Sequence, residues 1–395
     1  MSSAAAADVE LPLAIFIIFV SARLMREVLE RLRLPGIIGE ILAGVIVGPH
    51  VLGWIRPSVF LTDLSELGVM FLLFRIGLEV RTADLMKIGR TAITVAVSGV
   101  TLSFIAAGGL ALLWGRARVE AMFIAAAMVA TSVVITAEVL SSRGLLSARA
   151  SRVILASAVV DDILGLIVLA VVSGEARGSV NWFDLILTAL LAICFTLFLA
   201  MWGHRAARLI VPGVKSRLSL AEAEFTFSIA TLFGLAVLAV YAGVAAIIGA
   251  FLAGMALAES VEDRVHTMTA GVSELLVPFF LAGIGMRLDP RALADRSTLT
   301  LALALLVAAL LSKLVGCGLG ALRLGRADAL RVGAGMAPRG EVGMIVAQLG
   351  HEMGVMSNSI FAIIIFLSVA TTLAAPPMIR FAFRGVRSHP QNERV

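Results

Sequence analysis

Two adjacent aspartates, Asp161 and Asp162, lie in the middle of an apolar stretch, VILASAVVDDILGLIVLAVV, that is long enough to cross a bilayer. A charged side chain at the centre of a membrane costs about 3 kcal/mol on insertion scales. Two neighbouring carboxylates cost more, because each disfavours ionisation of the other. The pair therefore indicates a site that binds a cation, a proton, or each in turn. The alternative is two buried acids that only satisfy neighbouring donors, and the rarity of intramembrane charge argues against it.

A lysine, Lys313, occupies similar depth in a second apolar stretch, LLVAALLSKLVGCG. A buried ammonium group needs a partner, and either of the two aspartates could supply it. An Asp–Lys pair beside a second Asp can exchange a sodium ion for protons, because the carboxylates ionise when the ion binds and take up protons when it leaves. Such coupled groups titrate as a set. The alternative is an ion pair with no part in transport.

Two further apolar segments are each interrupted by polar residues at mid-membrane. One interruption is Thr131-Ser132, and the other runs from Pro338 to Glu341 and includes Gly340. Proline cannot donate a backbone hydrogen bond, and glycine loosens a helix. Exposed backbone at this depth is tolerated only where it lines a cavity or is buried in protein. The interruptions therefore predict two broken helices whose ends supply partial charges and free carbonyls near the aspartates.

Other charges within the apolar segments could act in more than one way. Arg339 and Glu341 could form an ion pair that holds the second broken helix, which is the favoured interpretation, or Glu341 could touch the ion. Arg75 lies where a packing face would favour an apolar residue, and it could pair with Glu138 or with Glu341.

The elements that must position these residues are membrane-spanning helices. The chain has 395 residues, of which 60% are hydrophobic and 15% charged, whereas soluble domains have about 25% charged residues. We expect an all-α polytopic membrane protein. Apolar windows predict thirteen spans, at 9–25, 36–52, 62–79, 89–114, 119–141, 148–173, 183–210, 218–237, 239–258, 267–286, 297–322, 329–350 and 357–383.

The sequence contains an internal repeat. Residues 37–46, IIGEILAGVI, match residues 247–256, IIGAFLAGMA, at six of ten positions. Residues 71–85 match residues 279–293 at nearly the same offset, 208 instead of 210. The offset corresponds to seven spans, an odd number, so the two halves face opposite ways across the membrane. Inverted repeats with paired broken helices are typical of secondary transporters. Chance similarity between Gly/Ala-rich helices is the alternative.

Composition also restricts topology and partners. The formal charge is +5, but the arginines lie in short loops, where they set topology rather than bind nucleic acid. Most of the 32 Lys and Arg residues fall on the C-terminal side of the thirteen spans. This predicts an inner-membrane protein with its N-terminus outside and its C-terminus in the cytoplasm. The scattered Cys and His residues predict no resident metal site, and we expect no cofactor.

The chain resembles the NapA-type sodium/proton antiporters of the monovalent cation:proton antiporter-2 superfamily in the motifs AVVDDILGL, TSVV, LLSKLVG, GEILAGVIVGP and RGEVG. The resemblance covers essentially the whole chain, with the motifs in the right order. The resemblance implies a thirteen-helix homodimer of the NhaA/NapA-like fold, with its two broken helices crossing at mid-membrane. It implies Asp162 as the principal cation-binding carboxylate and Asp161 as the partner of Lys313. Thr131 and Ser132 would be ligands or near-ligands of the ion.

The resemblance also implies a division into domains. Spans 1, 2, 8 and 9 (residues 1–58 and 217–262) would form the dimerisation domain. Spans 3–6 and 10–13 (59–178 and 263–384) would form the ion-carrying core, with 179–216 as a linker helix and 385–395 as a cytoplasmic tail. The core would move past the dimerisation domain like an elevator.

The expected function is exchange of Na⁺ and Li⁺ for H⁺, electrogenic, with a role in pH homeostasis, by a lipid-embedded transporter rather than an enzyme. Two alternatives stay open. One is a K⁺/H⁺ or other monovalent cation/H⁺ antiporter on the same fold, because oxygen ligands suit all hard cations. The other is a sodium-coupled symporter of organic anions, which would need more positive groups in its cavity than Lys313.

Overall fold

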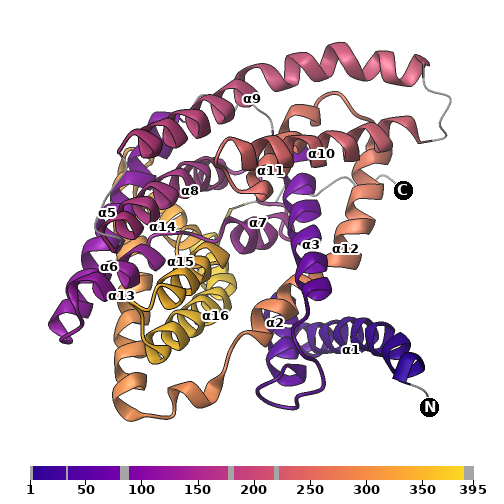
Figure 1. The fold of residues 1–395 in the computed structure, drawn as a ribbon. Helices are drawn as coiled ribbons and strands as arrows, with labels where there is room; N and C mark the ends of the chain where they lie inside the picture. Colours follow the sequence, from indigo (N-terminus) through magenta and orange to yellow (C-terminus); the bar gives the residue numbers. More distant parts are fainter. Residues whose placement is uncertain (1–2, 33, 81–88, 177–181, 218–221, 387–395) are drawn as a thin grey trace.

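In the computed structural model, which describes residues 3–32, 34–80, 89–176, 182–217 and 222–386, the chain is all-helical and these residues contain no β-strand. Each of the thirteen predicted spans corresponds to one helix or to one broken pair of helices (Figure 1). The predicted fold class is confirmed. Among the described residues, six helices are long and apolar enough to cross a membrane, by length and composition alone: α5, α8, α10, α12, α13 and α16.

The helices follow one another along the chain with short connections. The first half comprises α1 (Ser3–Arg31), α2 (Gly36–Val47), α3 (Val59–Leu78), α5 (Gly89–Leu113), α6 (Arg118–Ala127), α7 (Val133–Ser141) and α8 (Arg149–Ala176). The long helix α9 (Trp182–Arg217) joins it to the second half. That half comprises α10 (Ala223–Tyr241), α11 (Ala246–Leu257), α12 (Asp263–Met286), α13 (Arg296–Gly320), α14 (Arg326–Gly335), α15 (Glu341–Glu352) and α16 (Asn358–Ala382), with short 3₁₀ turns at Pro290–Leu293 and Leu322–Leu324.

The helix boundaries repeat at the offset found in the sequence. Adding 210 to the bounds of α2 gives those of α11, and adding 208 to the bounds of α6 gives those of α14. The same shift carries the first residue of α7 onto that of α15. The repeat therefore extends over elements in which the sequence similarity is too weak to see.

Two close helix crossings show that the repeats are related by a two-fold operation. A Cβ atom built on Gly44 of α2 would lie 2.0 Å from the carbonyl oxygen of Ala282 in α12. The repeat carries these two residues onto Gly254 of α11 and Phe74 of α3, where the corresponding distance is 2.2 Å. Only glycine allows two helices to approach this closely. Each repeat thus packs the second glycine of its shared motif, Gly44 or Gly254, against the other repeat.

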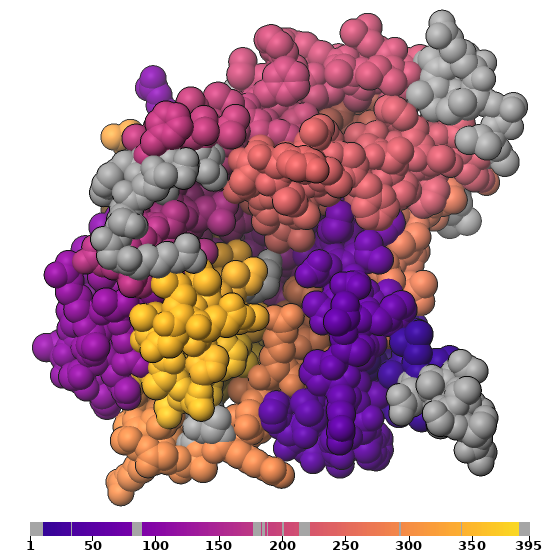
Figure 2. Space-filling view, in the orientation of Figure 1, coloured from indigo at the N-terminus to yellow at the C-terminus, as the bar shows by residue number. Residues whose placement is uncertain are grey.

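The helix contacts form two groups. The frame helices, α1–α3 and α10–α12, pack on one another, and the core helices, α5–α8 and α13–α16, do the same. Helix α9 contacts α10 and α11 of the frame and α8 of the core, and it runs along one edge of the molecule (Figure 1). On the face seen in Figure 2, the yellow C-terminal helices and the indigo N-terminal helices lie on opposite sides.

This packing differs from the predicted division at the third and tenth spans. Both were expected in the ion-carrying domain, but α3 and α12 pack mainly on each other and on α11 and α2. The physical reason is the pair of glycine crossings, which bring the backbones of α3 and α12 against frame helices. Which group moves and which forms a dimer stays a prediction.

Candidate functional site

The two broken helices cross at their interruptions. Residues 128–132 separate α6 from α7, and residues 336–340 separate α14 from α15. The backbone N–H of Ser132 donates to the carbonyl oxygen of Pro338 at 2.9 Å. A Cβ atom on Gly340 would lie 2.6 Å from Cβ of Ser132, so this approach requires glycine. The interruptions predicted from the sequence are therefore joined to each other inside the core group.

Asp161 of α8 ties this crossing to α13. Its Oδ2 accepts the backbone N–H of Thr131 at 2.9 Å, and its Oδ1 accepts Nζ of Lys313 at 2.6 Å. Both charged side chains are completely buried. The hydroxyl of Thr131 donates to the carbonyl oxygen of Met336 at 3.3 Å. A buried ion pair survives only with good geometry and additional hydrogen bonds, and Asp161 has both.

Asp162 is buried too, with 6% of its surface exposed. An α-helix turns by about 100° per residue, so its side chain leaves α8 in a different direction from that of Asp161. The hydroxyl of Ser132 is buried and has no hydrogen-bond partner among the described residues. An unpaired buried hydroxyl costs about 1–3 kcal/mol. The crossing thus holds an oxygen that a bound cation or water could use.

Arg339 is fully buried, and its guanidinium bonds to the first interruption and to helices α13 and α5. It donates to the carbonyl oxygens of Val129 at 3.1 Å and Ala309 at 2.9 Å, and to the hydroxyl of Ser103 at 3.3 Å. Val129 follows the last turn of α6, where helix carbonyls lack partners. A cation there also offsets the negative end of the helix dipole. Arg339 therefore stabilises the end of one broken helix from the interruption in the other.

The predicted pair of Arg339 with Glu341 stays a prediction, because the side chain of Glu341 lies outside the described residues; its backbone begins α15. The structure brings the remaining predicted residues together: Asp161, Asp162, Thr131, Ser132, Lys313 and Arg339 all belong to the core helices or their interruptions.

Several polar residues of this region were missed. Thr371 of α16 accepts the backbone N–H of Arg339, and Thr372 donates to its carbonyl oxygen. Ser157 lies one turn before Asp161, and its buried hydroxyl has no partner among the described residues. The sequence signal was present, since each is a hydroxyl residue in an otherwise apolar helix, but serine and threonine occur too often in such helices to be selected without the fold.

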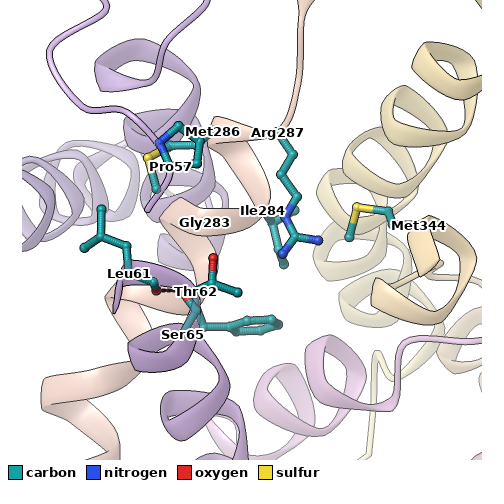
Figure 3. Close-up of a pocket in the computed structure, with 10 residues that line it drawn as sticks. Pro57, Leu61, Thr62, Ser65, Gly283, Ile284, Met286, Arg287 and Met344 are labelled. Atoms are coloured by element: carbon teal, nitrogen blue, oxygen red, sulfur yellow. Dashed lines mark hydrogen bonds between the residues drawn. The ribbon is translucent and has the colours of Figure 1, made fainter. Parts of the chain in front are cut away.

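A small cavity of about 70 Å³ lies between the two helix groups. Its lining includes Thr62 and Ser65 of α3, Ile284 of α12 and Met344 of α15. Figure 3 shows Arg287, at the end of α12, extending into the space between α12 and α15. At the volume that each molecule takes in liquid water, the cavity has room for roughly two water molecules. Met344 lies one turn from the start of α15, so the cavity is close to the crossing. It lies on the side of the crossing at which α3 begins and α12 ends.

Known proteins are similar to this chain in sequence or in fold. It is 33% identical to the Na⁺/H⁺-K⁺ antiporter GerN of Bacillus cereus, over 93% of this chain and 95% of that protein. It is 32% identical to the high-affinity Na⁺/H⁺ antiporter NhaS3 of Synechocystis sp., over 97% and 92%. The structure of the sodium proton antiporter MjNhaP1 from Methanocaldococcus jannaschii at pH 8 superposes with a TM-score of 0.67 and 18% identity, covering 95% of this chain and 99% of that one.

The structural likeness supports the fold, and the sequence likeness identifies the family. The family model described as "Sodium/hydrogen exchanger, transmembrane" matches residues 15–385, which include every helix of the frame and the core except the beginning of α1. This chain belongs to the transmembrane sodium/hydrogen exchanger family.

Proposed function

We propose that this protein exchanges Na⁺ and Li⁺ for H⁺ across the inner membrane, with the buried carboxylates of α8 as its coupling site. The observation that carries the proposal is the position of Asp161 and Asp162, buried beside two interrupted helices that bond to each other. Charge at this depth is expensive, and an exchanger requires a group that holds either a cation or a proton. Membership of the family supports the same activity.

In this mechanism Asp162 is the principal cation ligand. The carboxylate of Asp161 already accepts two hydrogen bonds, whereas the buried hydroxyl of Ser132 has no partner among the described residues. Ser132 and Thr131 would add oxygen ligands, as a hard cation requires. When the ion leaves, Asp162 takes up a proton, so the cation and the proton compete for one site.

Lys313 makes the exchange electrogenic in this proposal. With no sodium bound, its ammonium neutralises Asp161. Sodium binding would weaken that pair, so that Lys313 releases a proton in addition to the one from Asp162. Two protons would then move against one sodium ion.

The moving body would be the core helices, which contain both interruptions, sliding against the frame helices. The inverted repeat supports alternating access, because exchanging the conformations of its two halves converts an outward-facing state to an inward-facing one. The frame helices would form the homodimer, embedded in lipid, with the N-terminus outside and the C-terminus in the cytoplasm.

The test is proton movement in proteoliposomes on addition of sodium, lithium or potassium. We expect wild type to respond to sodium and lithium, and Asp162→Asn to give no response. Asp263→Asn removes an exposed carboxylate at the start of α12 and serves as the matched control with wild-type exchange. Full exchange by Asp162→Asn would overturn the site, and no response of wild type to any cation would overturn the activity.

Potassium is the second candidate ion. One relative that aligns over almost its whole length is named an Na⁺/H⁺-K⁺ antiporter. Oxygen ligands alone do not select between Na⁺ and K⁺. A response of wild type to potassium but not to sodium, lost in Asp162→Asn, would keep the site and change the substrate.

A further inference from the structure

A proline interrupts the backbone hydrogen bonding of one frame helix. Pro278 lies inside α12, and proline has no backbone N–H, so the carbonyl group four residues earlier loses its usual donor. That carbonyl belongs to Glu274. A carbonyl without a donor is costly within a membrane, and where a span contains proline, neighbouring groups must satisfy the carbonyl that it frees.

The side chain of Arg23 in α1 supplies the missing donor. Its Nη2 donates to the carbonyl oxygen of Glu274, the one that Pro278 leaves free. Its Nη1 lies 3.6 Å from Oε1 of Glu40 in α2, which also accepts Nη1 of Arg26 at 3.1 Å. Glu40 is completely buried and offsets the charge of the arginines. The two terminal nitrogens of one guanidinium therefore meet two acceptors, a freed carbonyl and a carboxylate.

Further contacts hold α12 directly after the proline. The ring of Phe279 stacks on that of Phe19 in α1, with the two centroids 6.3 Å apart. Cζ of Arg23 lies 5.5 Å from the centroid of the Phe19 ring. Ser65 of α3 donates to the carbonyl oxygen of Phe279 at 3.0 Å. Arg23 thus belongs to the contacts that fix the direction in which α12 continues beyond Pro278.

The C-terminal half of α12, Phe279–Met286, forms one wall of the cavity in Figure 3. Phe280 and Ile284 line the cavity from α12, and Met344 of α15 lines it from the core. The direction of this half therefore sets the spacing of frame and core close to the crossing. The arrangement belongs to one repeat only, because the counterpart of Pro278 in α3 is Met70, which has a backbone N–H.

We propose that Arg23 is a positioning residue for cation binding. By holding the carbonyl that Pro278 leaves free, it fixes the C-terminal half of α12 and keeps the cavity at the width that lets the cation reach Asp162. The inference rests on the proposed function, because it takes Asp162 as the cation ligand and the cavity as the route to it. It gives a role in transport to an arginine outside the ion site.

The test is a double-mutant cycle of Arg23→Gln and Pro278→Ala, read by sodium titration of exchange in proteoliposomes. Without Arg23 the carbonyl of Glu274 loses its donor, so the protein spends only part of its time in the arrangement that binds the cation, and KM rises by the inverse of that fraction. We expect a rise of about tenfold at a similar maximal rate, the factor that corresponds to a weak hydrogen bond from a charged group. In Pro278→Ala the backbone N–H of the new alanine serves the carbonyl instead, so Arg23→Gln should then raise KM by less than about twofold.

Thermal unfolding makes the same comparison without relying on transport. Arg23→Gln should lower Tm much more in the wild-type background than in the Pro278→Ala background. Arg23→Lys, whose single ammonium group cannot match both acceptors as a guanidinium does, covers the case in which Arg23→Gln fails to fold. It should show the same difference between the two backgrounds at a smaller size.

Two controls separate support of the carbonyl from ion pairing. Arg26→Gln removes the nearer partner of Glu40 but no bond to α12 among the described residues, so its effects on Tm and KM should be equal in both backgrounds. Arg31→Gln breaks an exposed pair with Glu27 within α1 and should behave like wild type.

Equal effects of Arg23→Gln on KM and Tm in the two backgrounds would overturn the proposal and leave Arg23 as a partner of Glu40 only. A difference in Tm with none in KM would overturn the role in cation binding. Absence of exchange in wild type would remove the proposed function, whereas the Tm comparison would still test the bond from Arg23 to the carbonyl of Glu274.

Discussion

The glycine crossings allow a sharp test of the inverted repeat. Gly285 of α12 is the counterpart of Gly77 of α3, at the offset of 208. A Cβ atom on Gly285 would lie 2.0 Å from the carbonyl oxygen of Ile41, and one on Gly77 would lie 2.2 Å from that of Phe251. Ile41 and Phe251 are themselves counterparts. The two alanine variants, Gly285→Ala and Gly77→Ala, should therefore have nearly equal effects, although the positions lie far apart in the sequence.

The expected magnitude follows from the geometry. A carbon atom approaches a carbonyl oxygen to about 3.3 Å, so each variant must part its two helices by more than about 1 Å. The neighbour is backbone and cannot rotate away, which places the cost near the upper end of about 1–3 kcal/mol for overpacking. Alanine within a helix recovers about 0.5–1 kcal/mol relative to glycine. We expect a net destabilisation of about 2 kcal/mol for each variant.

Thermal unfolding of the detergent-solubilised protein measures this. Gly271 lies in the same helix as Gly285, but a Cβ atom built there meets nothing within 4 Å. Gly271→Ala is the matched control and should be as stable as wild type or more stable. Equal stability of Gly285→Ala and Gly271→Ala would refute the close crossing. A large loss for Gly285→Ala with none for Gly77→Ala would refute the two-fold relation.

Four further predictions concern the site and its supports. Lys313→Gln should abolish transport currents on solid-supported membranes while proton movement persists, and a wild type without current would contradict the electrogenic mechanism. Thr131→Ala should raise the KM for sodium more than it lowers the maximal rate, as measured by sodium titration of exchange. Arg339→Gln leaves buried carbonyls without their donor and should cost about 3 kcal/mol in thermal unfolding. Arg118→Gln, which breaks an exposed pair with Glu175, is the neutral control. Hydrogen bonds from Ser297 and Thr298 lower the pKa of Asp295 below its ordinary value of 3.8. The ionised carboxylate therefore contributes stability above pH 3.8, and this contribution disappears as the pH falls through the lowered pKa. Asp295→Ala should remove this part of the acid dependence of Tm.

Much of the fold could be predicted from the sequence, because the membrane imposes strong constraints on it. Apolar windows separated by charged turns located each span, and even the weak division between 218–237 and 239–258 corresponds to two helices, α10 and α11. The repeat was visible because glycines at helix crossings cannot vary: Gly44 and Gly254 match for the same steric reason.

The grouping of helices could not be predicted in the same way. The motifs of α3 and α12 do not say which neighbours their glycines meet, and the structure shows that these neighbours are frame helices. For the site, the aspartates and Lys313 were evident because charge in an apolar segment is rare. The bond from the Thr131 N–H to Asp161, and those from Arg339 to two carbonyls, depend on backbone positions at the crossing, which no side-chain pattern encodes.

The two repeats are symmetric in their helices but not in their carboxylates, and this difference matters for transport. The crossing of the interruptions joins both repeats, through Ser132 of one and Pro338 of the other. The counterparts of Asp161 and Asp162 in α16, however, are Val369 and Ala370. A scaffold of two equivalent halves would give its two inverted states equal energy, so carboxylates and charged pairs present in only one half must determine which state is favoured. The carboxylates of the ion site belong to α8 of the first repeat, so occupancy of the site acts on one half of an otherwise balanced molecule.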